Sequence, residues 1–249
     1  MKTSVFQEIK TLYHLTLSPV RGQTHAERLE SFYSKQAIGY DDFRHKLLQG
    51  RRELYQAIDV PANGVWIEMG GGTGSNLEFL REKIAKLKAV YIVDLAPSLL
   101  AIADERIKSN GWTNVHTVLA DVGSFKLPNE TEKADVITFS YSLTMIPRWF
   151  KAVDRAIALL RDGGKIGVVD FYISPQHPDQ GRAQHNAWTR NFWRLWFGMD
   201  QVNLSPDHLD YLTERLTPLL VSEHRASVPY LPWLGKVPYY RFIGQKRTQ

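Results

Sequence analysis

The middle of the sequence alternates between continuous apolar runs and segments of helical periodicity. This alternation constrains the fold more than any other feature. The apolar runs are VWIEMG at 65–70, AVYIVDLA at 89–96, VHTVLAD at 115–121, ADVITFSYSL at 134–143 and KIGVVDFY at 165–172. Strands buried on both faces give continuous hydrophobic runs, and parallel strands need long crossover connections, which are usually helical. The pattern therefore predicts an α/β fold with a mostly parallel, doubly wound sheet and helices on both of its faces.

Four segments around these runs have the spacing of amphipathic helices. Apolar residues recur at helical intervals between Ala26 and Ile58, and segment 75–87 leaves a glycine-rich turn. Segment 97–111 has proline in its first turn and glycine beyond its end, as helices often do. Segment 148–164 reads as a helix closed by a glycine pair.

The length of 249 residues fits a single domain, which we expect to span residues 1–249. Within it, residues 1–60 are predicted to form a helical N-terminal segment that acts as a lid or substrate segment. A helical insertion is predicted at 174–215, before the last strands. The extended tail that follows is rich in proline and fits an antiparallel hairpin at the sheet edge, with two short strands around Leu234 and Gly235.

Composition excludes several classes of function. The chain has no cysteine, so disulfides, thiolate nucleophiles and cysteine-ligated zinc are excluded, and a reducing compartment is favoured. The N-terminus lacks the apolar core of a signal peptide, and no stretch has the length of a membrane span, so we expect a cytoplasmic protein. The net charge of +5 suits an anionic partner or simply solubility. No run dense in lysine and arginine is present, so no nucleic-acid partner is expected.

The turn EMGGGTGSN at 68–76 lies between the first apolar run and a predicted helix. This is the carboxyl end of a strand, where open parallel sheets bind ligands. A phosphate-binding P-loop needs lysine and then serine or threonine after its last glycine, whereas this chain has Ser75 and Asn76. The glycine spacing also departs from the dinucleotide fingerprint. A turn that only packs a strand tightly against a helix stays open.

The segment EMGGGTG resembles the first motif of class I S-adenosylmethionine-dependent methyltransferases, in which an acid precedes three glycines at alternate positions. Glu68, Gly70, Gly72 and Gly74 occupy those positions. The resemblance implies a Rossmann-like sheet of seven strands with an antiparallel C-terminal edge hairpin, and S-adenosyl-L-methionine as the cofactor. The glycines would admit the methionine half of the cofactor, and the acid would hold its ammonium group directly or through water.

Acids at later strand ends extend this interpretation. Asp94 ends the second apolar run, where a carboxylate can accept hydrogen bonds from both ribose hydroxyls. The resemblance assigns Asp121 to the adenine amino group, and it places the donor and acceptor near Ser140 and Tyr141. The residues predicted to bind the cofactor are Tyr40, Arg44, Glu68, Gly70, Gly72, Gly74, Asn76, Asp94, Leu95, Asp121, Val122 and Ser140.

Two outer segments resemble the N-methyltransferase of betaine-lipid synthesis, the BtaB type. They are FYSKQAIGYDDFRHKLLQGRREL at 32–54 and VPYLPWLGKVPYYRFIGQK at 228–246. That family has a Tyr-Asp-x-x-Arg stretch followed by Gly-Arg, and a Pro-Tyr-rich tail that ends in an aromatic strand. With the central motifs, the similarity covers most of the chain. It implies successive methylation of the amine of diacylglyceryl-homoserine, a lipid headgroup, in peripheral contact with the anionic inner face of the membrane.

Methyl transfer to an amine requires position, desolvation and a neutral nitrogen, and it needs no metal. Aromatic faces accommodate the growing cation. The predicted catalytic residues are Tyr141, Tyr33 and His45, and the predicted acceptor-binding residues are Arg51, Trp188 and Tyr239. Tyr40 and Arg44 fit either the carboxylate of the cofactor or that of the acceptor.

Other interpretations of these residues stay open. Tyr33 and Tyr40 fit core positions of amphipathic helices equally well, and Arg51 and His45 fit a solvated surface. The aromatic stretch at 188–197 fits either the core or a surface that enters lipid headgroups. The alternative activities are methylation of phosphatidylethanolamine or of a small amine, aminocarboxypropyl transfer on the same fold, and a cofactor-binding scaffold without turnover. The sequence does not indicate an oligomeric state.

Overall fold

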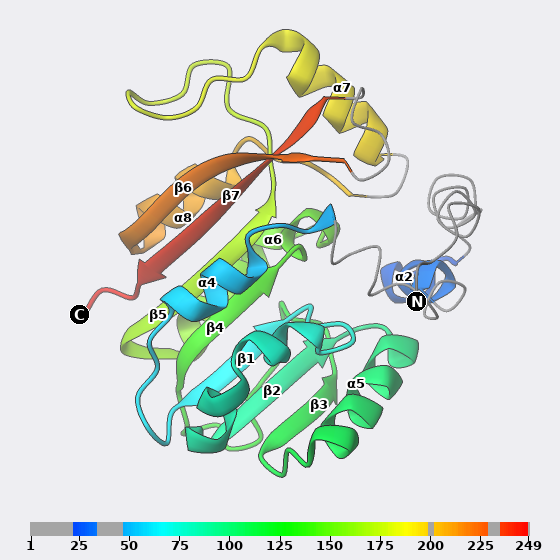
Figure 1. Ribbon diagram of the computed structural model, residues 1–249, viewed down its shortest axis with the longest axis vertical. Helices are drawn as coiled ribbons and strands as arrows, with labels where there is room; N and C mark the ends of the chain where they lie inside the picture. Colours follow the sequence, from blue (N-terminus) through cyan, green and yellow to red (C-terminus); the bar gives the residue numbers. More distant parts are fainter. Residues whose placement is uncertain (1–21, 34–46, 199–201, 229–234, 249) are drawn as a thin grey trace.

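A computed structural model describes residues 22–33, 47–198, 202–228 and 235–248 (Figure 1). Its centre is a seven-stranded sheet in the order β3-β2-β1-β4-β5-β7-β6. The strands are β1 Val65–Met69, β2 Ala89–Asp94, β3 Val115–Leu119, β4 Ala134–Ser140, β5 Leu160–Phe171, β6 Thr217–Ser227 and β7 Lys236–Gln245. The first five are parallel, and β6 and β7 form an antiparallel hairpin beside β5. The predicted fold class is confirmed.

Helices cover both faces of this sheet. The α-helices are α2 His25–Tyr33, α4 Arg51–Ala57, α5 Pro97–Asn110, α6 Trp149–Leu159, α7 Ala187–Gly198 and α8 His208–Arg215. Three short 3₁₀ helices accompany them: η1 Ser75–Phe79, η2 Arg81–Lys86 and η3 Leu143–Met145. In the part of the chain that the structure describes, no helix is long and apolar enough to cross a membrane.

Alternate residues of each strand face two apolar layers, as the pleat requires. On β1, Trp66 belongs to a layer that includes side chains of α4, α5 and α7. Ile67 and Met69 belong to a second layer, which includes side chains of α6 and α8. The central strands are buried on both faces, and this explains their continuous apolar sequence.

The helix predicted over 75–87 is instead two 3₁₀ helices. Arg81 begins the second of them with a positive φ of 30°, which interrupts regular α-helical hydrogen bonding. The apolar side chains that suggested a helix, Leu77, Leu80 and Ile84, are nevertheless all buried. The predicted apolar face is therefore correct, and the tertiary packing decides the local conformation.

The helical periodicity predicted from Ala26 to Ile58 is divided between α2 and α4, and residues 34–46 lie outside the described part of the chain. Gly50 precedes α4 with a left-handed φ of 80°. The edge hairpin also differs from its prediction. Its strands are long, 11 residues in β6 and 10 in β7. β6 was missed because it lies at the sheet edge and buries few of its side chains, so its sequence carries a weak apolar pattern.

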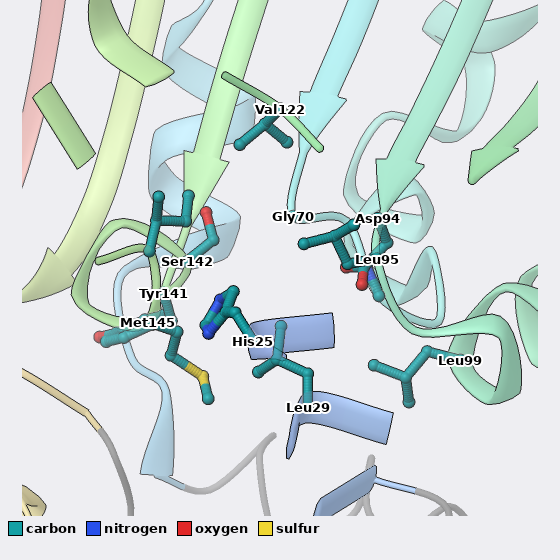
Figure 2. Close-up of a pocket in the computed structure, with 12 residues that line it drawn as sticks. His25, Leu29, Gly70, Asp94, Leu95, Leu99, Val122, Tyr141, Ser142 and Met145 are labelled. Atoms are coloured by element: carbon teal, nitrogen blue, oxygen red, sulfur yellow. The ribbon is translucent and has the colours of Figure 1, made fainter. Parts of the chain in front are cut away.

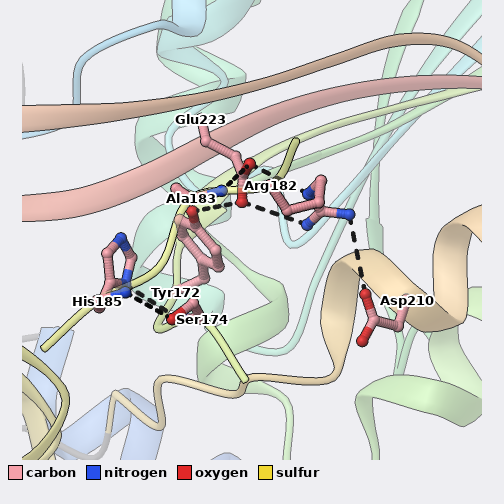
Figure 3. A network of polar contacts seen from close by, with 7 residues as sticks. All are labelled: Tyr172, Ser174, Arg182, Ala183, His185, Asp210 and Glu223. Atoms are coloured by element: carbon pink, nitrogen blue, oxygen red, sulfur yellow. Dashed lines mark hydrogen bonds and ion pairs between the residues drawn. The ribbon is translucent and has the colours of Figure 1, made fainter. Parts of the chain in front are cut away.

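The connection from β5 to α7 is fixed to this hairpin by a polar network (Figure 3). Glu223 of β6 accepts hydrogen bonds from the Tyr172 hydroxyl at 2.6 Å and from Arg182 Nε at 3.1 Å. Nearer to α7, His185 Nδ1 accepts a hydrogen bond from the Ser174 backbone N–H at 2.9 Å, and the His185 N–H donates to Ser174 Oγ. These contacts set where α7 begins relative to the end of β5.

Candidate active site

A cavity lies at the carboxyl ends of the parallel strands (Figure 2). The space between its lining residues, open solvent included, is about 510 Å³. The loops after β1, β2 and β4 form most of its wall, and the loop after β3, α2 and the first turn of α5 complete it. The lining residues are His25, Leu29, Gly70, Gly72, Asp94, Leu95, Leu99, Val122, Tyr141, Ser142, Met145 and Ile146.

The predicted glycines divide into two groups. Gly70 and Gly72 line the cavity and have φ angles of 69° and 55°, which glycine adopts without strain. A Cβ at Gly70 would lie 2.5 Å from Ser142 Cβ, so the turn approaches the loop after β4 too closely for a side chain. Gly74 instead packs on β2, where a Cβ would lie 2.8 Å from Ile92 Cδ1. Gly74 therefore fits the interpretation in which the turn packs a strand against a helix. Gly70 and Gly72 instead form part of a wall that can face a ligand.

Asp94 is positioned by backbone donors at the end of β2. Its Oδ2 accepts a hydrogen bond from the Gly72 N–H at 2.8 Å, and its Oδ1 accepts one from the Ala96 N–H at 2.9 Å. The side chain lines the cavity in a residue that is only 9% exposed. Carboxylate oxygens can accept more than one hydrogen bond each, so this geometry suits a ligand with hydroxyl groups.

The other predicted acid, Glu68, lies behind the glycine turn. It is fully buried and accepts hydrogen bonds from the Tyr55 hydroxyl at 2.9 Å and from Asn76 Nδ2 at 2.6 Å. Asn76 Oδ1 in turn accepts one from Arg51 at 3.0 Å, and Arg51 Nε donates to the Leu48 carbonyl. Burial, followed by the charge of Glu68, raises the pKa of Tyr55 well above its usual value, so this hydroxyl stays a donor.

Tyr141 follows β4 in a left-handed conformation, with φ of 53°. Its hydroxyl donates to the Gln49 carbonyl at 2.7 Å, and its ring packs edge-on against Phe171 at 4.6 Å. Burial and the nearby Asp170 charge raise the pKa of this hydroxyl well above its usual value. Tyr141 therefore offers a protonated, oriented side chain to the cavity and is poorly suited to act as a base.

Helix α2 contributes two lining residues that the sequence interpretation missed. Figure 2 shows the His25 imidazole pointing into the cavity beside Leu29. Burial, followed by the charge of Arg28, lowers the pKa of His25, so the imidazole is neutral near pH 7. A sequence signal for this helix exists, because Thr24 and Glu27 form a capping box in which the Glu27 N–H donates to Thr24 Oγ1 and the Thr24 N–H donates to Glu27.

Other missed residues come from the loop after β4 and from α5. Ser142, Met145 and Ile146 form one wall of the cavity, and Leu99 lies opposite on α5. The family pattern gave no separate signal for these side chains. The positions of these side chains in the cavity wall depend on how far each loop projects beyond its strand.

Several predicted residues lie elsewhere. Among the described residues, those lining the cavity do not include Glu68, Gly74, Asn76, Asp121, Ser140, Arg51, Trp188 or Tyr239. The Asp121 carboxylate is exposed and caps a turn by accepting the Gly123 N–H at 2.7 Å, whereas its neighbour Val122 does line the cavity. Ser140 is buried at the end of β4. The predicted ligand contacts of these side chains stay predictions.

Two of them share a second cavity. Arg51 and Tyr239 line a hollow with an empty volume of about 610 Å³, together with Leu48, Gln49, Gly50, Arg52, Glu53 and Phe79. Because the Tyr141 hydroxyl bonds the Gln49 carbonyl, Tyr141 joins this hollow to the first cavity. Trp188 lies on α7 and is 69% exposed. Tyr33 ends α2, and three predicted residues, Tyr40, Arg44 and His45, lie outside the described residues.

Residues 67–166, which supply most of the cavity wall, match the family model described as a methyltransferase domain. These residues form a methyltransferase domain, and the protein is an S-adenosyl-L-methionine-dependent methyltransferase. Its cofactor is S-adenosyl-L-methionine, as predicted from the glycine turn. The cavity wall suits this molecule chemically. Asp94 presents a carboxylate that can accept hydrogen bonds from hydroxyl groups, Gly70 and Gly72 present backbone without side chains, and Leu95, Leu99 and Val122 are apolar.

Comparison with known proteins agrees with this class. The ubiquinone/menaquinone biosynthesis C-methyltransferase UbiE of Ectopseudomonas mendocina is 25% identical over 171 residues, which cover 66% of this chain and 66% of that protein. The match thus spans just under two thirds of the relative.

Solved structures share the fold. Phosphoethanolamine N-methyltransferase 2 of Haemonchus contortus, in complex with phosphomonomethylethanolamine and S-adenosylhomocysteine, has a TM-score of 0.67 at 12% identity, covering 91% of this chain and 61% of that one. An O-methyltransferase family protein from Burkholderia thailandensis has a TM-score of 0.64 at 15% identity, covering 98% of this chain and 70% of that one. These neighbours act through different acceptor atoms, so the acceptor must be argued separately.

Proposed function

We propose that the protein methylates an amine, and that its acceptor is the amino group of diacylglyceryl-homoserine, which becomes a betaine lipid at the membrane surface. The observation that carries the methyl-transfer part is the Asp94 carboxylate, held by the Gly72 and Ala96 N–H groups at the wall of the cavity. The amine part is supported by the resemblance of segments 32–54 and 228–246, and by the amine N-methyltransferase of Haemonchus contortus among the neighbours.

When bound, S-adenosyl-L-methionine supplies a methyl group on a sulfonium, which an amine nitrogen takes with its lone pair while the sulfur keeps the electrons of the broken bond. The protein's contribution is to orient and to exclude water. Asp94 and the glycine turn hold one side of the cavity, and Leu95, Leu99 and Val122 keep it apolar. An apolar wall favours the neutral form of an amine over its ammonium form, and the neutral form is the one that reacts.

Tyr141 has the role of an aromatic wall in this proposal. Its hydroxyl is engaged with the Gln49 carbonyl and its ring is fixed against Phe171, so the side chain keeps one orientation. An aromatic face attracts a quaternary ammonium, which is the product of complete methylation. The neutral imidazole of His25 lines the cavity and can take up the proton that an amine loses between methylations.

Helix α7 supports contact with a membrane surface. Trp188 and Leu195 are 69% and 73% exposed, while Trp193 and Phe197 of the same helix are buried. The helix has no acidic residue and carries Arg194 on its exposed side. Exposed aromatic and aliphatic groups together with arginine are the features of helices that enter the headgroup region of anionic bilayers. Phe197 packs on Phe171 at 4.8 Å, so this helix adjoins the wall that holds Tyr141.

The acceptor is tested with labelled S-adenosyl-L-methionine and three separate acceptors: vesicles containing diacylglyceryl-homoserine, vesicles containing phosphatidylethanolamine, and a panel of soluble amines. We expect label in the first lipid and S-adenosylhomocysteine as the by-product. Label only in phosphatidylethanolamine or in soluble amines would reject the acceptor, and methylthioadenosine as the by-product would indicate aminocarboxypropyl transfer. A quinone precursor is added as a separate fourth sample, and label on its carbon would favour the chemistry named for the UbiE relative.

The membrane contact has its own test. The double change of Trp188 and Leu195 to serine should weaken binding to anionic vesicles, measured by sedimentation, by at least roughly a hundredfold, because full burial of each large apolar side chain contributes about 1.5–3 kcal/mol. The change should leave the affinity for S-adenosylhomocysteine unaltered, since neither side chain lines the cavity. Leu219 to serine, an exposed position on β6, is the matched control. Equal sedimentation of both variants would contradict the proposed contact.

A further inference from the structure

A buried acid that the proposed chemistry does not use lies next to the cavity. Asp170 is the penultimate residue of β5 and is fully buried. It pairs with Tyr240 of β7 across the antiparallel ladder. No ion pair in the described part of the chain involves it. Burying a carboxylate without a cation costs free energy unless hydrogen bonds compensate for the lost water. The hydrogen-bond partners of Asp170 therefore indicate which part of the structure it stabilises.

The Asp170 carboxylate binds the loop after β4. Its Oδ1 accepts a hydrogen bond from Thr144 Oγ1 at 2.8 Å, and its Oδ2 accepts one from the Thr144 backbone N–H at 3.2 Å. Oδ1 also accepts the N–H of Phe171 at 2.8 Å. Thr144 is the central residue of η3, between Ser142 on one side and Met145 and Ile146 on the other, and all three of these line the cavity.

The same loop is held from two other directions. The Thr144 carbonyl accepts the backbone N–H of Asn203 at 2.7 Å, which ties the loop to the segment that follows α7. Ser142 Oγ donates to the Met69 carbonyl at the start of the glycine turn. Asp170 thus supports the side of the loop that faces away from the cavity, while Ser142 joins the loop to the turn.

We propose that Asp170 is a positioning residue for the cofactor: in its ionised form it fixes Thr144, and through Thr144 it holds the cavity wall formed by Ser142, Met145 and Ile146. The proposal concerns cofactor binding and rests on the methyltransferase cavity, and it is independent of the identity of the acceptor.

The groups around Asp170 are neutral at physiological pH. Tyr141, next to the loop, and Tyr240, opposite on β7, both have pKa values raised well above the usual range, first by burial and then by the Asp170 charge. His208 of α8 lies near Tyr240, and burial lowers its pKa to about 3. Burial raises the pKa of the Asp170 carboxyl to about 7, while the hydrogen bonds from Thr144 and Phe171 act in the opposite direction.

Two quantities should therefore vary with pH in opposite directions. The ionised carboxylate accepts all three hydrogen bonds, whereas protonation converts one acceptor position into a donor, so cofactor affinity should rise as pH rises through about 7. The free energy of unfolding should fall as pH rises. The folded-state pKa lies above that of a carboxyl in an unfolded chain, so between about pH 4 and pH 7 the folded protein holds a proton that the unfolded chain has lost. The stability contributed by this group is present at low pH and falls as pH rises through that window.

The test measures binding of S-adenosylhomocysteine by calorimetry from pH 6 to pH 8.5, together with thermal melting. In Asp170→Asn an amide donor faces the Thr144 N–H, so we expect roughly tenfold weaker binding at pH 8 and little dependence on pH. Thr144→Val should also weaken binding, and Thr144→Ser should restore it. Thr117→Val removes the same kind of threonine-to-aspartate bond, to Asp104 on the surface, and should bind like the wild type.

His25 also lines the cavity and titrates below its usual pKa, so it needs its own control. His25→Gln should keep the rise in affinity between pH 6 and pH 8. Loss of the rise in that variant, or an equal pH dependence in Asp170→Asn and wild type, would overturn the proposal. If Asp170→Asn does not fold, Thr144→Val decides the question, and binding equal to that of Thr117→Val would overturn it.

Discussion

The glycine turn has two sides, and the two acids beside it lie on different ones. Asp94 ends β2 on the cavity side, where backbone N–H groups hold its carboxylate at the wall. Glu68 lies one strand away on the buried side, where the side chains of Tyr55 and Asn76 enclose it. The sequence pattern assigned the cofactor to both acids. One strand-end acid thus faces the cavity, whereas its neighbour is enclosed by side chains behind the glycine turn.

The cavity side is tested most strongly by Asp94→Ala. Loss of two hydrogen bonds to a charged acceptor, each contributing about 1.5–3 kcal/mol, should weaken S-adenosylhomocysteine binding by at least roughly a hundredfold. Calorimetry on folded protein measures this affinity. The Asp94→Asn variant keeps the size of the side chain and removes its charge, so it shows how much of the loss is due to the charge. Asp104→Ala removes an exposed acid from α5 and serves as the control. An unchanged affinity in Asp94→Ala would remove Asp94 from the cofactor site.

Gly70→Ala should give the next largest effect. The new Cβ would lie 2.5 Å from Ser142 Cβ at a φ of 69°, so the turn and the loop after β4 must separate. We expect both lower stability and roughly tenfold weaker cofactor binding. Gly111→Ala is a matched control, because Gly111 has a φ of 65° and no atom within 4 Å of the added Cβ. That variant should show only the strain of a left-handed alanine, about 1–2 kcal/mol. Equal losses in the two variants would contradict the close approach.

The buried side is tested by Tyr55→Phe, which removes one donor to Glu68. A buried hydrogen bond to a charged group is lost, so the free energy of unfolding should fall by about 1.5–3 kcal/mol. Cofactor affinity should change by less than roughly threefold, since the hydroxyl does not line the cavity. Denaturant unfolding and calorimetry on the same sample measure both quantities. A large loss of affinity with unchanged stability would mean that the two sides of the turn are not separate.

Sequence reasoning reached the parallel half of the sheet and the cavity side of the turn because their signals are local. Continuous apolar runs give β1, β2, β4 and β5. Gly70 and Gly72 lie in the turn after β1, and Asp94 is the last residue of β2. The direction in which the Glu68 side chain points was harder to predict from the sequence. Strand alternation places it on the face of Trp66, and only the packing of α4 shows that Tyr55 fills the space in front of it.

The remaining parts depend on contacts distant in sequence. β6 buries few side chains, so its edge position hides it from an apolar pattern. The wall after β4 is set by Asp170, whose partner Thr144 lies 26 residues away. His25 is the instructive exception. The capping box at Thr24 and Glu27 predicts the start of its helix, but no local signal predicts that this helix would lie over the cavity.

The attachment of α2 has a consequence for the timing of catalysis. His25 and Leu29 close one side of the cavity, and Glu30 ties their helix to α5 by accepting hydrogen bonds from the Ser98 N–H at 3.3 Å and the Ser98 hydroxyl at 3.0 Å. Spent cofactor must leave past this helix or past the loops opposite. Weakening the tie at Glu30 should therefore shorten the residence time of S-adenosylhomocysteine more than it alters the rate of binding, a difference that stopped-flow displacement resolves. The Glu30–Ser98 contact then helps to set how soon one turnover can follow another.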